Sequence, residues 1–173
     1  MRWRGWICLW AASLVIGEVG MTRFESRPAP RAAPPSRWPA GTSLERPANR
    51  CELLVFLHPC CPCSRATLAE LERVVARSRA AAELRILVSW DAEALPADGD
   101  ALVERARAIP GALVAVDLYA REARRFGASA SGQLLLYDAA GLLLFEGGIT
   151  TARGHEGGNA GEDALVAVLR IGI

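Results

Sequence analysis

The chain has 173 residues, enough for one domain of ordinary size and a short appendage. A hydrophobic fraction of 51% beside 23% charged residues is typical of a protein that forms a core, which excludes wholesale disorder. Twenty Lys and Arg residues against nineteen Asp and Glu residues leave a formal net charge of +1. This charge is too even for a non-specific nucleic-acid binder, so we expect no nucleic-acid partner.

The N-terminus has the pattern of a membrane anchor. Two arginines precede an uncharged apolar stretch, Gly5–Gly17, which Glu18 interrupts and residues 19–21 extend. A basic segment followed by an apolar stretch of this length is typical of a secretory signal or a signal anchor. Small residues suited to cleavage occur only early in the stretch. We therefore predict an uncleaved signal anchor or transmembrane helix over residues 1–21.

Residues 22–50 have the composition of a tether. They show almost no apolar periodicity and are rich in proline, with Pro28, Pro30, Pro34, Pro35, Pro39 and Pro47. Proline at this density favours extended, polyproline-like backbone. The pattern predicts a semi-rigid linker that holds a domain away from a membrane surface.

Residues 51–173 alternate strand and helix patterns. In chain order, periodicity and turn signals predict a buried strand at 53–57, an amphipathic helix at 64–79, a strand at 84–90, a helix at 100–109, a short strand at 113–116, a short helix at 118–126, strands at 134–137 and 142–145, and a helix at 163–170. Asp138–Gly141 is a strong hairpin signal. This order predicts an α/β sheet with helices on both faces.

Three of the five cysteines lie within four positions, Cys60–Cys63, directly after the first predicted strand and before the first predicted helix. Free backbone N–H groups and the helix dipole at such a place favour a thiolate over a thiol. The spacing of Cys60 and Cys63 brings two sulfurs to one face of a first helical turn, where Pro62 fits because its missing N–H has no helical partner. Cys61 and Cys63 point to different faces of a regular helix. The pattern favours redox chemistry over a structural metal site or inert thiols.

The domain resembles the thioredoxin superfamily, and within it the membrane-tethered TlpA and ResA type of thiol–disulfide oxidoreductase. Cys60–Cys63 falls on the family's C-x-x-C motif with its inner proline, and Phe126–Gly132 on the segment before the hairpin. The resemblance implies an α/β, thioredoxin-like fold, with a mixed central sheet and flanking helices, for residues 51–173. More narrowly, His58–Cys63 and Gly147–Gly157 resemble the bacterial RedB proteins.

Two positions depart from the thioredoxin pattern. Gly132 stands where the family has a cis-proline, and glycine reaches unusual dihedral angles without a cis bond. Leu54 stands where thioredoxins have a buried acid that relays protons, so the resolving thiol needs another base. The Cys-Pro-Cys pattern of the narrower group suggests Cys61 and Cys63 as the working pair, and the sequence leaves this pair and Cys60 with Cys63 both open.

A glycine-rich segment, Gly147–Gly161, follows the hairpin. The fold that the resemblance implies brings this segment beside the cysteines. It carries Arg153, Asn159 and His155, one of two histidines in the chain. An imidazole is suited to accept a thiol proton, and a guanidinium to hold a thiolate; the other interpretation is a glycine loop with solvated side chains. The predicted catalytic residues are Cys60, Cys61, Cys63, His155 and Arg153.

We expect a thiol–disulfide oxidoreductase that exchanges disulfides with protein partners, needs no cofactor, and is held by a single span in the cell membrane with its domain in the periplasm. The alternative is a domain that binds or delivers Cu(I) or Zn(II) through the cysteines and His58 or His155, because soft thiolates and imidazole suit these ions. Adjacent cysteines around a proline give poor tetrahedral geometry for this. A peroxidase of peroxiredoxin type would have Thr or Ser three residues before its cysteine, where this chain has Leu57 or His58.

Overall fold

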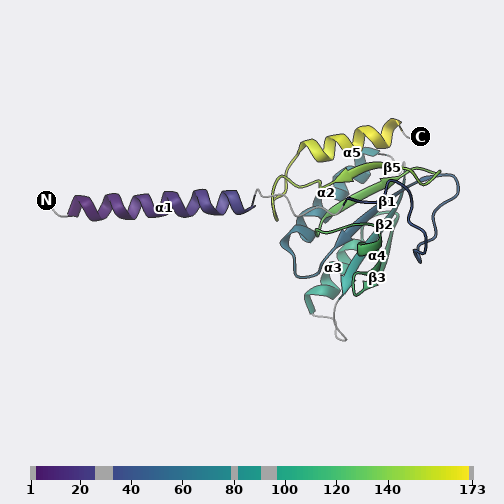
Figure 1. The fold of residues 1–173 in the computed structure, drawn as a ribbon, viewed down its shortest axis with the longest axis horizontal. Coiled ribbons are helices and arrows are strands. Elements are labelled where there is room, and N and C mark those ends of the chain that lie inside the picture. The colour runs from purple at the N-terminus through teal and green to yellow at the C-terminus, as the bar shows by residue number, and fades with distance from the viewer. Residues whose placement is uncertain (1–2, 26–32, 79–81, 91–96, 172–173) are drawn as a thin grey trace.

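A mixed five-stranded sheet in the order β3-β2-β1-β4-β5 forms the centre of the domain (Figure 1). The computed structural model describes residues 3–25, 33–78, 82–90 and 97–171. The strands are β1 (Cys51–Leu57), β2 (Ala82–Trp90), β3 (Ala112–Leu118), β4 (Gln133–Tyr137) and β5 (Leu143–Gly147). β1, β2 and β3 are parallel, and β4 runs antiparallel to both β1 and β5. All seven residues of β1 are buried, which explains its unbroken apolar run.

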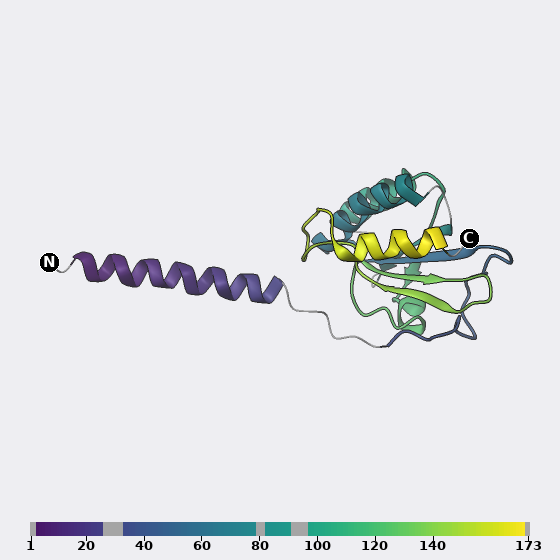
Figure 2. The same ribbon diagram turned by 90° about the horizontal axis from the view of Figure 1, so that it is seen from above.

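Helices cover both faces of the sheet, as predicted (Figure 2). The helices of the domain are α2 (Pro62–Ser78), α3 (Ala97–Arg107), α4 (Arg121–Arg125) and α5 (Ala160–Ile171). Apolar side chains of α2, α3 and α5 form the main core against one face of the sheet. A smaller core on the other face includes Ala123 of α4 and Phe126.

One predicted helix, 118–126, begins later than expected. β3 continues through Leu118, and α4 starts only at Arg121. The reason is Asp117, whose buried carboxylate accepts hydrogen bonds from the backbone N–H groups of Glu122 at 2.9 Å and Ala123 at 2.8 Å. A carboxylate in this position satisfies donors that a helix start leaves unpaired. The remaining elements differ from prediction only at their ends.

The N-terminal helix α1 (Trp3–Glu25) projects away from the domain (Figure 1). Its segment Gly5–Phe24 has 20 residues, a mean hydropathy of 1.4 and no burial inside the protein. By length and composition this helix can cross a membrane. It extends past residue 21, where the predicted anchor ends.

Part of the predicted linker packs on the domain. Residues 33–50, which we call the strap, run along the face of the sheet that carries α4 (Figure 2). The backbone N–H of Trp38 donates to the carbonyl of Gly141 at 2.7 Å. The indole of Trp38 meets Phe126 and Tyr137 edge-on at centroid distances of 4.9 and 5.3 Å. The Tyr137 hydroxyl donates to the carbonyl of Pro35 at 2.9 Å, and burial raises the pKa of this phenol to about 12. This part of the proline-rich chain covers an aromatic cluster instead of standing free.

Replacing Trp38 by Ala should lower the free energy of unfolding by about 2–3 kcal/mol, because it removes a half-buried ring from this aromatic cluster. Chemical denaturation of the full chain in detergent, followed by circular dichroism, measures the change. Arg37→Ala is the matched control, since Arg37 is the exposed neighbour in the strap and should change stability by less than about 0.5 kcal/mol. Equal stability of both variants would show that the strap does not stabilise the domain.

Candidate functional site

The cysteine motif lies where β1 ends and α2 begins. Cys60 is exposed, Cys61 and Cys63 are partly buried, and all three are free thiols. A turn forms because the N–H of Cys61 donates to the carbonyl of His58 at 3.1 Å. α2 then begins at Pro62, so that Pro62 occupies the helix start as predicted and Cys63 lies in the first turn.

Cys61 and Cys63 contact each other through a hydrogen bond between their thiols. Two residues of a regular helix at this spacing would diverge. Cys61 lies before the first helical residue, so its backbone is not bound to helical geometry and its sulfur can turn toward Cys63. The pair that the sequence left as the second choice is therefore already in contact in the reduced protein.

The pKa of Cys63 is raised above its ordinary value. Burial is the largest cause, and the hydrogen bond and negative potential of Cys61 add to it. Two groups act in the opposite direction: the backbone N–H of Gly154 donates to the Cys63 sulfur, and the positive charge of Arg153 stabilises its thiolate. Cys63 is thus mainly protonated at neutral pH. Gly154 and Arg153 lie beside it and would stabilise the Cys63 thiolate once it forms.

The glycine-rich loop lies against the motif, as the topology predicted. Gly154 adopts a left-handed φ of +71° and approaches Pro62 so closely that a Cβ atom there would lie 3.0 Å from the Pro62 side chain. Arg153 and His155 on either side of it are exposed. The backbone N–H of His155 donates to the carbonyl of Ala152 at 3.2 Å, which closes a tight turn. The loop therefore brings Arg153 and the amide of Gly154 to the thiol, and proton transfer by His155 stays a prediction.

Two polar side chains hold this loop in place: Glu70, which the sequence analysis did not name, and Asn159, for which it gave no structural role. The buried carboxylate of Glu70 on α2 accepts a hydrogen bond from the backbone N–H of Gly157. Asn159 donates to the carbonyl of Ile149 at 2.7 Å and accepts from the N–H of Glu162 at 3.0 Å, which caps α5. The spacing of Asn159 and Glu162 is a capping signal that could have been found in the sequence. Glu70 offered no such signal, because it is one charged residue among several on an amphipathic helix.

Two serines fasten the motif to the segment before β4. The hydroxyls of Ser64 and Ser131 lie 2.7 Å apart, and both accept from the N–H of His58, at 3.1 and 3.0 Å. Ser64 also donates to the carbonyl of His58 at 2.6 Å. These bonds fix the chain at the point where it leaves β1, and so fix the direction from which the cysteines enter α2.

Gly132 takes the place of the family's cis-proline, and the described residues contain no cis peptide bond. Its φ of +87° lies in the left-handed region, and its N–H donates to the carbonyl of Phe56 at 2.7 Å. A Cβ atom on residue 132 would lie 2.5 Å from the Thr67 hydroxyl oxygen, which is buried without a hydrogen-bond partner. Backbone conformation and space both require glycine here.

Leu54 is fully buried among Phe56, Leu87 and Tyr137 in the smaller core. The position of the family's acid is thus apolar. Among the residues that the structure describes, no three Cys, His, Asp or Glu side chains are grouped so that they could hold a metal ion. A metal site of the cysteines with His58 or His155 stays a prediction.

The shifted pKa of Cys63 has a measurable consequence. Alkylation of Cys63 should reach half its maximal rate above the pH typical of a free thiol, because burial and Cys61 disfavour the thiolate. Arg153→Ala should move this midpoint further up, since it removes a stabilising positive charge. Peptide-resolved alkylation with a small maleimide over a pH series gives the midpoint. Arg170→Ala, on an exposed residue of α5, is the control; an unchanged midpoint in Arg153→Ala would show that this charge does not reach the thiol.

No family model and no curated protein matches the sequence. Among solved structures, the chain resembles an uncharacterized conserved protein from Geobacillus kaustophilus (TM-score 0.60, 16% identity, 83% of this chain and 80% of that one). It also resembles an exposed lipoprotein thioredoxin from Streptococcus pneumoniae, with a TM-score of 0.50 and 16% identity over 72% of this chain and 86% of that one. A third likeness is to an SCO1/SenC family lipoprotein from Bacillus anthracis, with a TM-score of 0.50 and 9% identity over 72% of this chain and 82% of that one. Sheet order, helix placement and these likenesses agree that the chain has a thioredoxin-like fold.

Proposed function

We propose that the protein is a membrane-tethered thiol–disulfide oxidoreductase that exchanges disulfides with protein partners. The observation that carries this proposal is an exposed thiol, Cys60, followed by the partly buried Cys61 and Cys63 at the start of α2 in a thioredoxin-like fold. The likeness to a lipoprotein thioredoxin supports it at the level of fold. The apolar helix α1 supports a single membrane span, and we assign the domain to the periplasmic side as part of the proposal.

The proposed reaction begins at Cys60. Its thiolate attacks one sulfur of a partner disulfide, forms a mixed disulfide and releases the first partner thiolate. Cys63 then attacks the Cys60 sulfur, which releases the second partner thiolate and leaves an intramolecular disulfide. Two electrons pass from the two cysteines to the partner, and the reverse sequence oxidises a partner dithiol.

Loss of the Cys63 proton is the demanding step, because burial raises the pKa of this thiol. With Leu54 in the place of an acid, we assign the proton to His155 in the glycine-rich loop, directly or through water. The N–H of Gly154 and the charge of Arg153 then hold the thiolate. Cys61, in contact with Cys63, is the alternative partner for the internal disulfide.

The test is performed on the full chain in detergent. After mild oxidation, mass spectrometry of the peptide that contains residues 58–65 should show one internal disulfide and one alkylated thiol, and the reduced protein should reduce a disulfide-bonded protein substrate. Three freely alkylated thiols after oxidation would refute the proposal. Copper or zinc bound at one ion per chain, and protecting the thiols until a chelator is added, would instead favour metal delivery.

A further inference from the structure

The end of α1 contacts the loop that borders the thiols. The Arg153 guanidinium lies over the ring of Phe24, with its carbon 5.2 Å from the ring centroid. The next residue, Gly154, donates its N–H to the Cys63 sulfur and packs on Pro62. Phe24 of α1 therefore contacts Arg153, and the residue after Arg153, Gly154, contacts the partly buried thiol of Cys63.

Phe24 also marks a depth in the bilayer. Gly5–Phe24 has 20 residues, which corresponds to about 30 Å of helix and so to the thickness of a hydrocarbon core. Phe24, as the last residue of this segment, lies at the boundary between acyl chains and headgroups, and Arg23 beside it can extend to the headgroups. A side chain stacked on Phe24 then lies at headgroup level.

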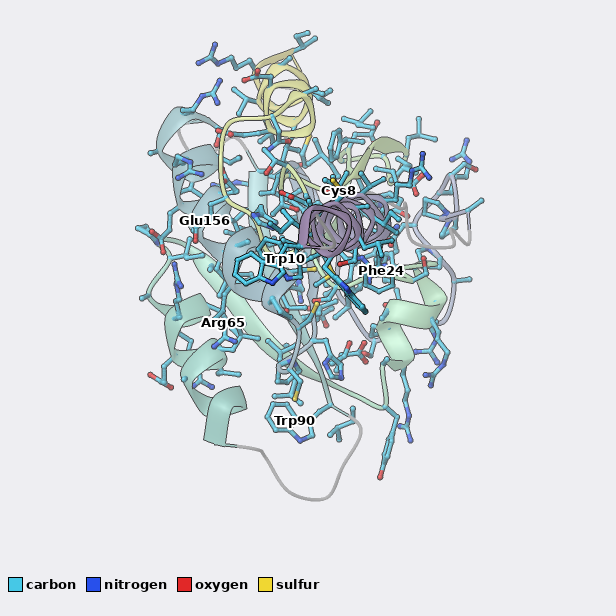
Figure 3. The ribbon with its side chains drawn as sticks, turned by 90° about the vertical axis from the view of Figure 1, so that its left-hand side faces the viewer. Cys8, Trp10, Phe24, Arg65, Trp90 and Glu156 are labelled. Carbon is cyan, nitrogen blue, oxygen red and sulfur yellow. The ribbon has the colours of Figure 1, made fainter. Side chains whose placement is uncertain are left out.

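Other charged groups of the domain lie on the same side. Figure 3 looks along α1 toward the domain and shows Arg65 and Glu156 on the face from which α1 projects. Arg65, Arg153 and Cys60 are exposed, the charge of Arg153 reaches the thiol of Cys63, and Glu156 supplies one opposing charge. Guanidinium groups bind phosphate well, because their planar donors match its oxygens. We call the surface formed by Cys60, Arg65, Arg153 and Glu156 the thiol face.

We propose that the thiol face docks on the anionic headgroup layer of the membrane that α1 spans, through Arg153 and Arg65, and that Cys60 therefore acts at the membrane surface. The substrates would be cysteines that lie close to the membrane plane, such as those in the first residues outside a membrane span. The docking rests on α1 as a membrane anchor, which is part of the proposed function, and the substrate class rests in addition on the proposed thiol chemistry.

The experiment measures the depth of two spin labels on the full chain in nanodiscs of phosphatidylcholine and phosphatidylglycerol. The labels are attached through p-acetylphenylalanine at Glu156 and at Ala140, so that the native cysteines stay unlabelled. Ala140 is exposed in the β4–β5 turn, at the end of the domain away from α1 (Figure 1). Power saturation with oxygen and a nickel complex should place label 156 at the headgroups. Label 140 should lie more than about 13 Å further from the membrane, because the length of β4 separates the two ends of the domain.

Substitution of the proposed contact completes the test. Arg153→Glu should move label 156 out toward bulk water, while Arg170→Glu, an equal charge change in the last turn of α5, should leave it in place. Labels 156 and 140 at the same distance from the headgroups, or no difference between the two variants, would overturn the inference alone. A chain that fails to insert into the nanodiscs would overturn both this inference and the proposed membrane tether. If label 156 stays at the headgroups but the protein does not exchange disulfides, only the proposed oxidoreductase function is contradicted.

Discussion

Replacing Cys63 by Ser should abolish the internal disulfide and all multiple-turnover exchange, whichever cysteine is its partner. Both candidate pairs, Cys60 with Cys63 and Cys61 with Cys63, contain this residue. Without it the reaction stops at the mixed disulfide on the attacking cysteine, because the thiol that would release the partner is absent. Incubation of the variant with a disulfide-bonded substrate should therefore accumulate a covalent complex on non-reducing gels, which the unaltered protein does not accumulate.

The other two cysteines distinguish the pairs. Cys60→Ser should still form a disulfide between Cys61 and Cys63 under air, because their thiols are already in contact, but should lose exchange with protein substrates. Cys61→Ser should retain that exchange and serves as the matched control. If Cys60→Ser keeps full activity and Cys61→Ser loses it, the working pair is Cys61 with Cys63, and the role we give Cys60 is wrong.

The second large effect is expected from Gly161→Ala, in the first turn of α5. A Cβ atom on this residue would lie 2.1 Å from the carbonyl oxygen of Gly148, far inside van der Waals contact. A backbone carbonyl cannot rotate away as a side chain can, so the loop that begins at Gly148 must shift. We expect a loss of about 1–3 kcal/mol in the free energy of unfolding, less the fraction of a kcal/mol that alanine gains in a helix. Chemical denaturation measures it.

The same substitution should change the chemistry of Cys63, because the displaced loop carries the amide of Gly154 that donates to its sulfur. The pH midpoint of Cys63 alkylation should rise together with the loss of stability. Gly158→Ala is the matched control: a Cβ atom there has no neighbour within 4 Å, and residue 158 does not require a left-handed φ. If Gly161→Ala resembles Gly158→Ala in both measurements, the loop does not hold the thiol site in position.

Most of the fold was predictable because its elements have strong local signals. The apolar run of β1 and the hairpin residues Asp138–Gly141 are both found where the patterns predicted them, and the parallel order of the first three strands follows from the alternation of strands and helices. The resemblance to thioredoxins predicted correctly that the loop after β5 lies beside the cysteines. The narrower resemblance to RedB proteins stays a prediction.

The features that were not predicted depend on contacts between distant parts of the chain. Trp38 gave no sign of its packing, since Phe126 and Tyr137 lie far along the sequence and only the folded sheet brings them together. Glu70 is buried and accepts a hydrogen bond from the N–H of Gly157, which a helical pattern does not reveal. The Cys61–Cys63 contact was missed because helical spacing was applied to a residue that lies just outside the helix.

The strap determines which fragment of this protein can be studied in water. A fragment that starts at Cys51, the predicted domain boundary, would lack Trp38 and leave the aromatic rings of Phe126 and Tyr137 without their cover. It would also remove the backbone hydrogen bonds that Trp38 and Ser36 make with Gly141 and Leu143, at the start of the outermost strand. Open strand edges and uncovered apolar patches promote aggregation. A soluble fragment should therefore begin near residue 33, where the strap begins.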